Sequence, residues 1–577
     1  MDNKIRAVYE KWLDSPALSE GEWKELHDIR QDEKEIESRF FAPLEFGTAG
    51  LRGIMGMGTN RMNIHVIRHA TQAFANVIKA EGEEACKKGV VVCYDCRLNS
   101  DSFAREAACV MAGNGIFVRL FDDLRPTPEL SFAIRHYGAC AGINITASHN
   151  PKEYNGYKVY WSDGAQLPPQ HAEAIAKGME AIDTFTDITA MDYDQAVAQG
   201  KIVLIGKETD EAFLGKVLDQ AIDKAAVAQV ADKFQVVYTP FHGAGHLLVP
   251  EALRRLGIKH IHPVAEQMVM DGSFPTVDSP NPENPEGFYL AVDLARKVGS
   301  DLIIGTDPDS DRVGVMVRDG ENYVTITGNQ MGVLLLDYII QARKSTGTMP
   351  ENPAFLTTIV STMMARDVAE KNGVHAEETF TGFKFMAEKL AEYEKMEHPY
   401  HYLLAFEESY GYMMGDYVRD KDAVTASMMI AEMAAWYFQK GMTLKDAINA
   451  LYEKYGYYGE KTLNLVMPGL DGLEKMRALM ARLREEPLGE IGGTEVILQR
   501  DYQTGTLSVA GLGVVGSTPM AGSNVLYYEL ADGCSFIVRP SGTEPKIKIY
   551  ILAKAGTQAE CAARVEKYAA FAETLRP

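Results

Sequence analysis

Residues 142–158 read Gly-Ile-Asn-Ile-Thr-Ala-Ser-His-Asn-Pro-Lys-Glu-Tyr-Asn-Gly-Tyr-Lys. The apolar start, Gly142–Ile145, predicts a buried strand, and the small polar residues after it predict a loop. Such a loop can expose the Ser148 hydroxyl at its tip, with Lys158 able to return to it. We therefore predict a strand followed by a nucleophile loop; a polar turn without chemistry is the alternative.

The same order of strand, polar loop and helix recurs along the chain. Further short apolar runs lie at Val90–Val92, Val236–Tyr238, Leu302–Ile304 and Ala354–Leu356. Helical periodicity separates them, as in one apolar face built from Phe213, Leu214, Val217, Leu218, Ala221 and Ile222, with Thr209 as its predicted cap. This alternation predicts α/β domains with largely parallel or mixed sheets, in which ligands bind beyond the carboxyl ends of the strands.

The two ends of the chain have a different pattern. Near the N-terminus, Ser19 and Glu22 predict a capping box at the start of a helix. Near the C-terminus, short strands at Val525–Leu530 and Ile547–Leu552 precede a helix from Gln558, which predicts a smaller α+β domain.

With 577 residues, the chain is too long for one hydrophobic core. We predict four domains. They are residues 1–205 with the N-terminal helices and Ser148, residues 206–321 with an acidic loop, residues 322–460, and residues 461–577.

Composition excludes several classes of function. A net charge of −22 argues against nucleic acid as a partner, because phosphate backbones require a basic surface. No run of 18 apolar residues occurs, and the charged N-terminus is unlike a signal peptide, so we expect a cytoplasmic protein without a membrane partner. The Cys93-Tyr-Asp-Cys96 motif ends a predicted buried strand, which favours packing over redox chemistry.

Three carboxylates alternate in Gly305-Thr-Asp307-Pro-Asp309-Ser-Asp311-Arg312, again after a predicted strand. Alternation in an extended loop places the carboxylates on one side, where they repel each other unless a cation is present. The twelve-residue calcium loop is excluded because a glycine and an acid are missing at its sixth and twelfth positions. The loop therefore predicts a Mg²⁺ site, with a solvated acidic turn as the alternative.

Two further loops carry groups suited to a phosphorylated sugar. Residues 539–546, Arg-Pro-Ser-Gly-Thr-Glu-Pro-Lys, offer an arginine fork, hydroxyls and backbone N–H groups to a phosphate dianion. Residues 407–410, Glu-Glu-Ser-Tyr, offer acceptors and a donor to sugar hydroxyls. Each loop taken alone is also compatible with an ordinary turn.

In this order, the four loops resemble those of the α-D-phosphohexomutase superfamily, and the similarity extends from Gly47-Thr-Ala-Gly-Leu-Arg52-Gly53 to Lys546. The forms Ala147-Ser-His-Asn-Pro151 and Phe406-Glu-Glu-Ser-Tyr-Gly-Tyr412 most resemble the bacterial phosphoglucomutase group, which is close to the phosphopentomutases. One departure is Phe406, because many members carry glycine at that position.

The resemblance implies four domains around a central cleft and a role for each loop. It implies a catalytic set and a metal set, which share the phosphorylated serine: Ser148, Arg52, Lys158, His149 and Arg312 for catalysis, and Ser148, Asp307, Asp309 and Asp311 for Mg²⁺. It also implies a substrate set: Lys384, Glu407, Ser409, Arg539, Ser541, Gly542 and Thr543.

The activity implied by the resemblance is interconversion of glucose 1-phosphate and glucose 6-phosphate through a phosphoserine enzyme, with glucose 1,6-bisphosphate as intermediate and activator. The partners implied are small-molecule sugar phosphates, and the chain is expected to be a monomer or a homodimer. A phosphopentomutase or a phosphomannomutase with the same mechanism is an alternative within the enzyme class. A phosphatase, or a non-catalytic regulator that binds sugar phosphates, is an alternative from another class.

Overall fold

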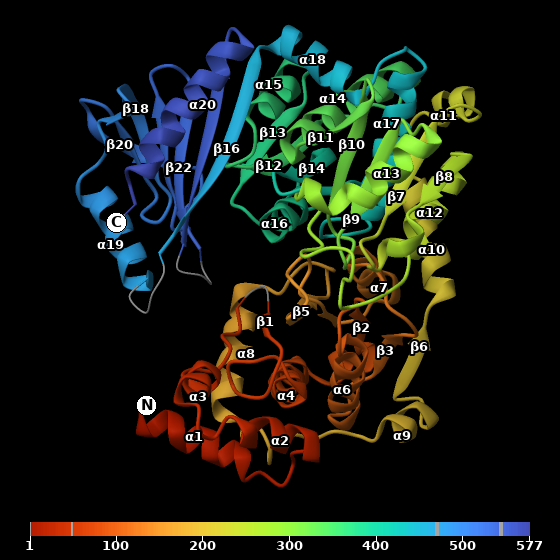
Figure 1. Cartoon of the computed structure of the whole chain (residues 1–577), viewed down its shortest axis with the longest axis vertical. Coiled ribbons are helices and arrows are strands. Elements are labelled where there is room, and N and C mark those ends of the chain that lie inside the picture. Colours follow the sequence, from red (N-terminus) through yellow and green to blue (C-terminus); the bar gives the residue numbers. More distant parts are fainter. Residues whose placement is uncertain (1, 48–49, 468–471, 542–545, 577) are drawn as a thin grey trace. The chain divides into compact units, whose positions relative to one another are not determined.

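The computed structural model describes residues 2–47, 50–467, 472–541 and 546–576 (Figure 1). The chain packs as two compact units. The larger unit contains residues 1–328, 387–391 and 409–443, and the smaller unit contains residues 329–386, 392–408 and 444–577. Within the described residues, no helix combines the length and the apolar composition needed to cross a bilayer.

The first sheet of the larger unit is mixed, in the order β1–β5–β4–β2–β3–β6. Its strands are β1 (Leu51–Ile54), β2 (Val90–Tyr94), β3 (Val118–Phe121), β4 (Ala141–Ile145), β5 (Tyr154–Trp161) and β6 (Ile202–Ile205). Strands β2 and β4 are parallel, whereas β5 runs antiparallel to both β4 and β1. Both β2 and β4 therefore end at the same edge of the sheet.

Within the residues that the structure describes, helices precede the first of these strands and connect the later ones. They are α1 (Asn3–Leu13), α2 (Glu20–Asp28), α3 (Glu33–Phe40), α4 (Ile64–Ala80), α5 (Glu83–Lys88), α6 (Ser100–Gly113), α7 (Thr127–Tyr137), α8 (Pro169–Ala181) and α9 (Tyr193–Ala198). The capping box predicted at Ser19 and Glu22 is confirmed at the start of α2.

The second sheet of the larger unit is also mixed, in the order β11–β10–β9–β7–β8. Its strands are β7 (Gln235–Thr239), β8 (His260–Pro263), β9 (Leu302–Thr306), β10 (Val313–Asp319) and β11 (Asn322–Ile326). Its neighbours in the chain are α10 (Lys207–Leu218), α11 (Lys224–Val230), α12 (Gly245–Leu256), η1 (Ala265–Gln267), η2 (Pro285–Phe288) and α13 (Tyr289–Val298). Residues 409–443 of this unit contain β15 (Gly411–Met413), which is not a strand of the second sheet, and α17 (Ala423–Phe438). Helix α17 packs against α12 and is buried almost throughout because nearly all its side chains are apolar or small.

In the smaller unit, β12 (Pro353–Thr358) pairs in parallel with β13 (His375–Thr379) and β14 (His401–Glu407). The helices of this part of the chain are α14 (Gly328–Thr346), α15 (Met363–Lys371), α16 (Phe383–Tyr393) and α18 (Leu444–Tyr455).

The C-terminal part of the smaller unit is built on an antiparallel sheet in the order β16–β23–β22–β21–β18–β19–β20, with β17 paired to β18. Its elements are β16 (Tyr457–Val466), α19 (Gly472–Glu485), β17 (Glu490–Ile491), β18 (Thr494–Asp501), β19 (Thr506–Val509), β20 (Gly513–Ser517), β21 (Leu526–Leu530), β22 (Ser535–Pro540), β23 (Lys546–Ala555) and α20 (Gln558–Glu573). Helix α20 lies against β16 and β23 (Figure 1). This confirms the predicted C-terminal α+β fold.

The strands predicted from apolar runs are confirmed, whereas the predicted cap of one helix is wrong. Helix α10 begins at Lys207 with Gly206 at its N-cap, so Thr209 lies inside the helix. The helix ends at Leu218, and Ala221 and Ile222 lie beyond it. The four domain boundaries stay predictions.

Candidate active site

Ser148 lies in the serine loop, residues 146–151, directly after the wholly buried strand β4. Its φ of 54° places it in the left-handed region, which non-glycine residues rarely adopt. Its Oγ lies 3.1 Å from Asp307 Oδ2 and 3.2 Å from His149 Nδ1, and the residue is only 3% exposed. The structure thus brings the predicted nucleophile to the predicted metal ligands from a position 159 residues earlier in the chain.

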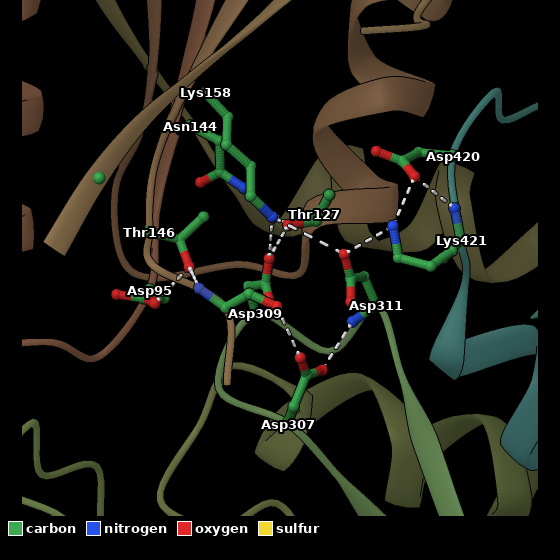
Figure 2. A network of polar contacts seen from close by, with 12 residues as sticks. Asp95, Thr127, Asn144, Thr146, Lys158, Asp307, Asp309, Asp311, Asp420 and Lys421 are labelled. Atoms are coloured by element: carbon green, nitrogen blue, oxygen red, sulfur yellow. Dashed lines mark hydrogen bonds and ion pairs between the residues drawn. The ribbon is translucent and has the colours of Figure 1, made fainter. Parts of the chain in front are cut away.

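Asp95, a carboxylate that the sequence analysis did not identify, stabilises the serine loop through Thr146. The Ser148 N–H donates to Thr146 Oγ1 at 2.8 Å, and that hydroxyl donates to Asp95 Oδ2 at 2.6 Å (Figure 2). Asp95 directly follows β2, so the parallel pairing of β2 with β4 brings it here. In the sequence, Asp95 stands between the two cysteines of Cys93-Tyr-Asp95-Cys96-Arg97, at the end of a predicted strand. This position after a strand is the pattern that could have identified it.

The metal loop, residues 307–312, follows β9 in the same way. One oxygen from each of Asp307, Asp309 and Asp311 lies within 4.8 Å of the others, and all three residues are buried. The Oδ1 atoms of Asp309 and Asp311 are buried without a hydrogen-bond partner among the described residues. Buried carboxylate oxygens that no donor satisfies are the ligands a hard cation requires, so the triad fits the predicted Mg²⁺.

Two lysines compensate part of this negative charge. Lys158 Nζ lies 2.8 Å from Asp309 Oδ2 and 3.7 Å from Asp311 Oδ2. Lys421 Nζ lies 3.1 Å from Asp311 Oδ2 and 3.0 Å from Asp420 Oδ1 (Figure 2). Lys158 was predicted, whereas Lys421 was missed; four consecutive charged residues, 419–422, immediately before an apolar helix were its signal in the sequence.

Helix α7 contributes a hydroxyl that orients Asp309. Thr127 Oγ1 donates to Asp309 Oδ2 at 2.7 Å, and Asn144 Nδ2 donates to Thr127 Oγ1 at 2.7 Å. The Thr127 N–H also donates to the Asp309 carbonyl at 2.8 Å. The Thr127 hydroxyl and the Lys158 ammonium thus occupy Oδ2 of Asp309 and leave Oδ1 for a ligand.

Burial and charge shift the titration of this cluster. Burial, reinforced by the neighbouring Asp309 and Asp311, holds the pKa of Asp307 well above its ordinary value. Burial would also raise the pKa of Asp309, but the ammonium of Lys158 outweighs it and the pKa is lowered. Burial, together with two nearby arginines, lowers the pKa of His149 well below its ordinary value, so this imidazole is neutral at pH 7.

The two predicted catalytic arginines contact loop residues. Arg52 Nη1, on β1, donates to Asn150 Oδ1 at 3.1 Å. Arg312 Nη1 donates to the carbonyl of Ser409 at 2.9 Å and pairs with Glu283 at 3.0 Å. Ser409, predicted to bind sugar, therefore lies in the same unit as the metal loop and contacts Arg312 through its backbone.

The remaining predicted substrate residues lie in the smaller unit. Glu407 ends β14 and accepts a hydrogen bond from the N–H of Gly382, so one of its carboxylate oxygens anchors the turn that begins α16. Lys384 lies in the first turn of that helix, with its ammonium 4.7 Å from the ring centre of Phe385. Arg539, in β22, and Ser541, just after it, are half-buried, whereas Gly542 and Thr543 lie outside the described residues.

Phe406, the departure noted in the sequence, is a core residue. It is completely buried, and its ring lies 5.5 Å from that of Phe355. A Cβ added to Gly332 would lie 2.5 Å from the ring of Phe406, so the aromatic side chain fills the space that this glycine leaves. The substitution therefore alters packing inside the smaller unit.

Repeated α/β domains with a serine beside a buried aspartate triad agree with the phosphosugar mutases that the sequence resembles. The chain belongs to the phosphoglucomutase/phosphomannomutase family. Family models match its α/β/α domain I at residues 43–186, domain II at residues 212–320 and domain III at residues 327–455.

Similar proteins agree with this membership. A phosphoglucomutase of Staphylococcus saprophyticus is 35% identical over 93% of this chain and 95% of its own, and one of Staphylococcus aureus is 36% identical over 91% and 92%. Among solved structures, the open form of Paramecium parafusin, a phosphoglucomutase, superposes with a TM-score of 0.66 at 18% identity, covering 93% of this chain and 95% of its own. A phosphoglucomutase/phosphomannomutase family protein of Burkholderia thailandensis gives 0.65 at 18% identity over 92% and 98%. At these identities the structures show a shared fold.

Proposed function

We propose that the chain is a phosphoglucomutase that interconverts glucose 1-phosphate and glucose 6-phosphate through phospho-Ser148. The observation that carries this proposal is the 3.1 Å separation between Ser148 Oγ and Asp307 Oδ2, at the entry to the aspartate triad. The names of the bacterial relatives that are 35–36% identical over almost the whole chain support glucose phosphate as the substrate.

The first half-reaction moves a phosphoryl group from Ser148 to the sugar. The bond between phosphorus and Ser148 Oγ breaks and a bond to the free hydroxyl of the monophosphate forms. The hydroxyl proton passes to a base, and Ser148 Oγ takes up a proton as it leaves. The second half-reaction returns the other phosphoryl group of the bisphosphate to Ser148. Enzymes of phosphoryl transfer work mainly by positioning these groups and stabilising their charge.

Several residues of the larger unit suit those tasks. Mg²⁺ held by Asp307, Asp309, Asp311 and a phosphoserine oxygen would supply charge stabilisation at the phosphoryl group. Lys158 and Arg52 add positive charge on the serine side, at Asp309 and Asn150 respectively. The neutral His149, at 3.2 Å from Ser148 Oγ, is placed to hydrogen-bond the serine oxygen.

The other assignments stay predictions. They are sugar binding by Lys384, Glu407 and Ser409, phosphate binding by Arg539, Ser541, Gly542 and Thr543, activation by glucose 1,6-bisphosphate, a cytoplasmic location, and a monomer or homodimer. Because Phe406 packs into a core, we attribute no sugar preference to it.

The second candidate is phosphomannomutase activity, which the family name includes. Glucose and mannose differ only at C2, so discrimination between them requires a contact to that hydroxyl. A phosphopentomutase with the same serine chemistry is the further alternative.

One experiment separates these readings. Intact-protein mass spectrometry should find phosphate on a fraction of Ser148, and kcat/KM should be highest for glucose 1-phosphate in a panel with mannose, ribose and deoxyribose 1-phosphates, each with its bisphosphate. A faster pentose would replace glucose as the substrate. Protein without phosphoserine and without turnover of any sugar would refute mutase activity and favour a binding protein.

A further inference from the structure

Arg97 lies completely buried behind the serine loop, and its guanidinium group is directed at the backbone. Its Nη1 donates to the carbonyls of Pro151 at 2.9 Å and Tyr154 at 3.0 Å. Its Nη2 donates to the carbonyls of Ser148 at 2.6 Å and Asn150 at 2.5 Å. One side chain thus binds four main-chain oxygens on both sides of the loop's tip.

Two neighbours fix the guanidinium group in this position. Its Nε lies 3.3 Å from Asp95 Oδ2, and its Cζ lies 5.2 Å from the centre of the Phe274 ring. The Arg97 N–H also donates to Asp95 Oδ1 at 2.9 Å. Asp95 therefore supports the serine loop in two ways. One carboxylate oxygen accepts from Thr146 in the loop, and the same carboxylate orients Arg97, which binds the loop's carbonyls.

The loop requires such support because Ser148 has a positive φ, which costs energy in a residue with a Cβ and persists only where the surroundings impose it. A phosphoserine enzyme adds a second requirement. In each turnover Ser148 gains and loses a group of charge near −2, and the loop must present Oγ in the same place in both states. Bonds to the main chain meet this requirement because they do not change when the side chain is modified.

We propose that Arg97 is a positioning residue for phosphoryl transfer: through three carbonyls of the serine loop and that of Tyr154 at the start of β5, it keeps Ser148 Oγ aligned in both the phosphorylated and the free enzyme. This inference rests on the proposed mutase function. Arg97 acts through the loop and not on the sugar, because its terminal nitrogens are directed at protein carbonyls. The planar fork is essential, since a lysine ammonium has three donors on a flexible stem and cannot span the four oxygens.

The matched test compares Arg97→Lys with Arg119→Lys in the full-length protein. Arg119 lies in the same domain, donates to the carbonyl of Lys88 at 2.9 Å and lies 4.7 Å from the Phe117 ring, but does not contact the serine loop. We expect Arg97→Lys to lower kcat about 10²-fold or more, because displacement of a reacting atom by about 1 Å has that effect, with KM within about threefold of wild type. Arg119→Lys should leave both constants unchanged.

Single-turnover transfer from ³²P-labelled glucose 1,6-bisphosphate to the dephosphorylated enzyme should slow by the same factor as kcat in Arg97→Lys. A purely structural role would instead reduce the fraction of active sites, with the remainder reacting at the wild-type rate. That result, or a folded Arg97→Lys with kcat within threefold of wild type, would overturn the inference. Wild-type protein lacking both turnover and phosphoserine would refute the proposed function itself, and this inference with it.

A second measurement does not depend on the variant folding. Crystal structures of the wild-type protein with and without phosphate on Ser148 should both keep the four Arg97–carbonyl distances below 3.5 Å and a positive φ at Ser148. Loss of two or more of these contacts in either state would overturn the inference.

Discussion

The serine loop and the metal loop follow their strands in the same way, but their polar atoms are satisfied differently. Three carbonyls of the serine loop, and that of Tyr154 just after it, accept hydrogen bonds from the buried guanidinium of Arg97, and the Ser148 N–H donates to Thr146. In the metal loop, Asp309 and Asp311 each keep a buried oxygen without a donor among the described residues, despite the nearby lysines. The polar atoms of the first loop are thus paired within the protein, whereas the second loop keeps carboxylate oxygens that could hold a cation.

The strongest test of this comparison is Ser148→Ala. We expect a fall in mutase activity of at least about 10³-fold, because the phosphoryl carrier is removed. The thermal midpoint should change little, since the loop is held through its backbone. Coupled assay and calorimetry measure both, with Ser102→Ala on α6 as the control, and near-normal turnover by a preparation free of wild-type enzyme would refute the serine mechanism.

The next test is Asp309→Asn, which removes charge from the loop that requires a cation. We expect activity to fall roughly 10²-fold and the Mg²⁺ requirement to rise, because several kcal/mol of charge stabilisation depend on the metal. Stability in EDTA should change little, because the lost ion pair with Lys158 is offset by relief of the repulsion among the three carboxylates. The amide oxygen can still accept from Thr127, and Lys158 retains Asp311 at 3.7 Å. Asp232→Asn at an exposed ion pair is the control. Full wild-type activity in excess EDTA would contradict the metal assignment.

Lys421→Met tests whether lysine side chains stabilise the metal loop when no metal is bound. Removing one partner of a buried ion pair costs about 3 kcal/mol, so unfolding in EDTA should become easier by about that amount. Mg²⁺ should restore part of the loss and should bind more tightly than to wild type, because a competing positive charge is gone. Denaturation with and without Mg²⁺ measures both effects, and weaker Mg²⁺ binding by the variant would show that Lys421 supports the metal instead.

The smallest expected effect is that of Thr127→Val, which keeps the shape and removes the hydroxyl between Asn144 and Asp309. Leaving buried polar atoms unpaired costs about 1–3 kcal/mol, and we expect kcat to fall about tenfold as Asp309 loses its orientation. Thr59→Val, away from both loops, is the control. A change in stability without a change in kcat or in Mg²⁺ dependence would restrict Thr127 to a structural role.

The sequence predicts the reactive and metal-binding residues of the two loops better than the residues that support these loops. Ser148 and the three aspartates stand in short, unusual motifs at strand ends, so their residue types and spacing already indicate the chemistry. The parallel pairing of β2 with β4, and the return of β5 antiparallel to β4, then explain why Lys158 meets the same site.

The supporting residues could not be predicted in this way because their partners are distant in the chain. Arg97 binds main-chain oxygens about 51–57 positions later, and Thr127 meets Asp309 across 182 positions. Backbone carbonyls leave no pattern in a sequence, and a threonine before a proline is typical of any helix start. The cap predicted at Thr209 was wrong because the helix begins at Lys207 and its N-cap is Gly206, a residue with no side chain to signal a cap.

The contacts of Arg97 also bear on how this loop can be altered. Because the arginine recognises only main-chain oxygens, it places no demand on the exposed side chain of Lys152, whereas Asn150 also accepts a hydrogen bond from Arg52. Variants randomised at Lys152 should therefore fold in most cases while differing in the group they carry next to the serine loop. The charge and size of this group can be changed without altering the backbone contacts that hold the loop.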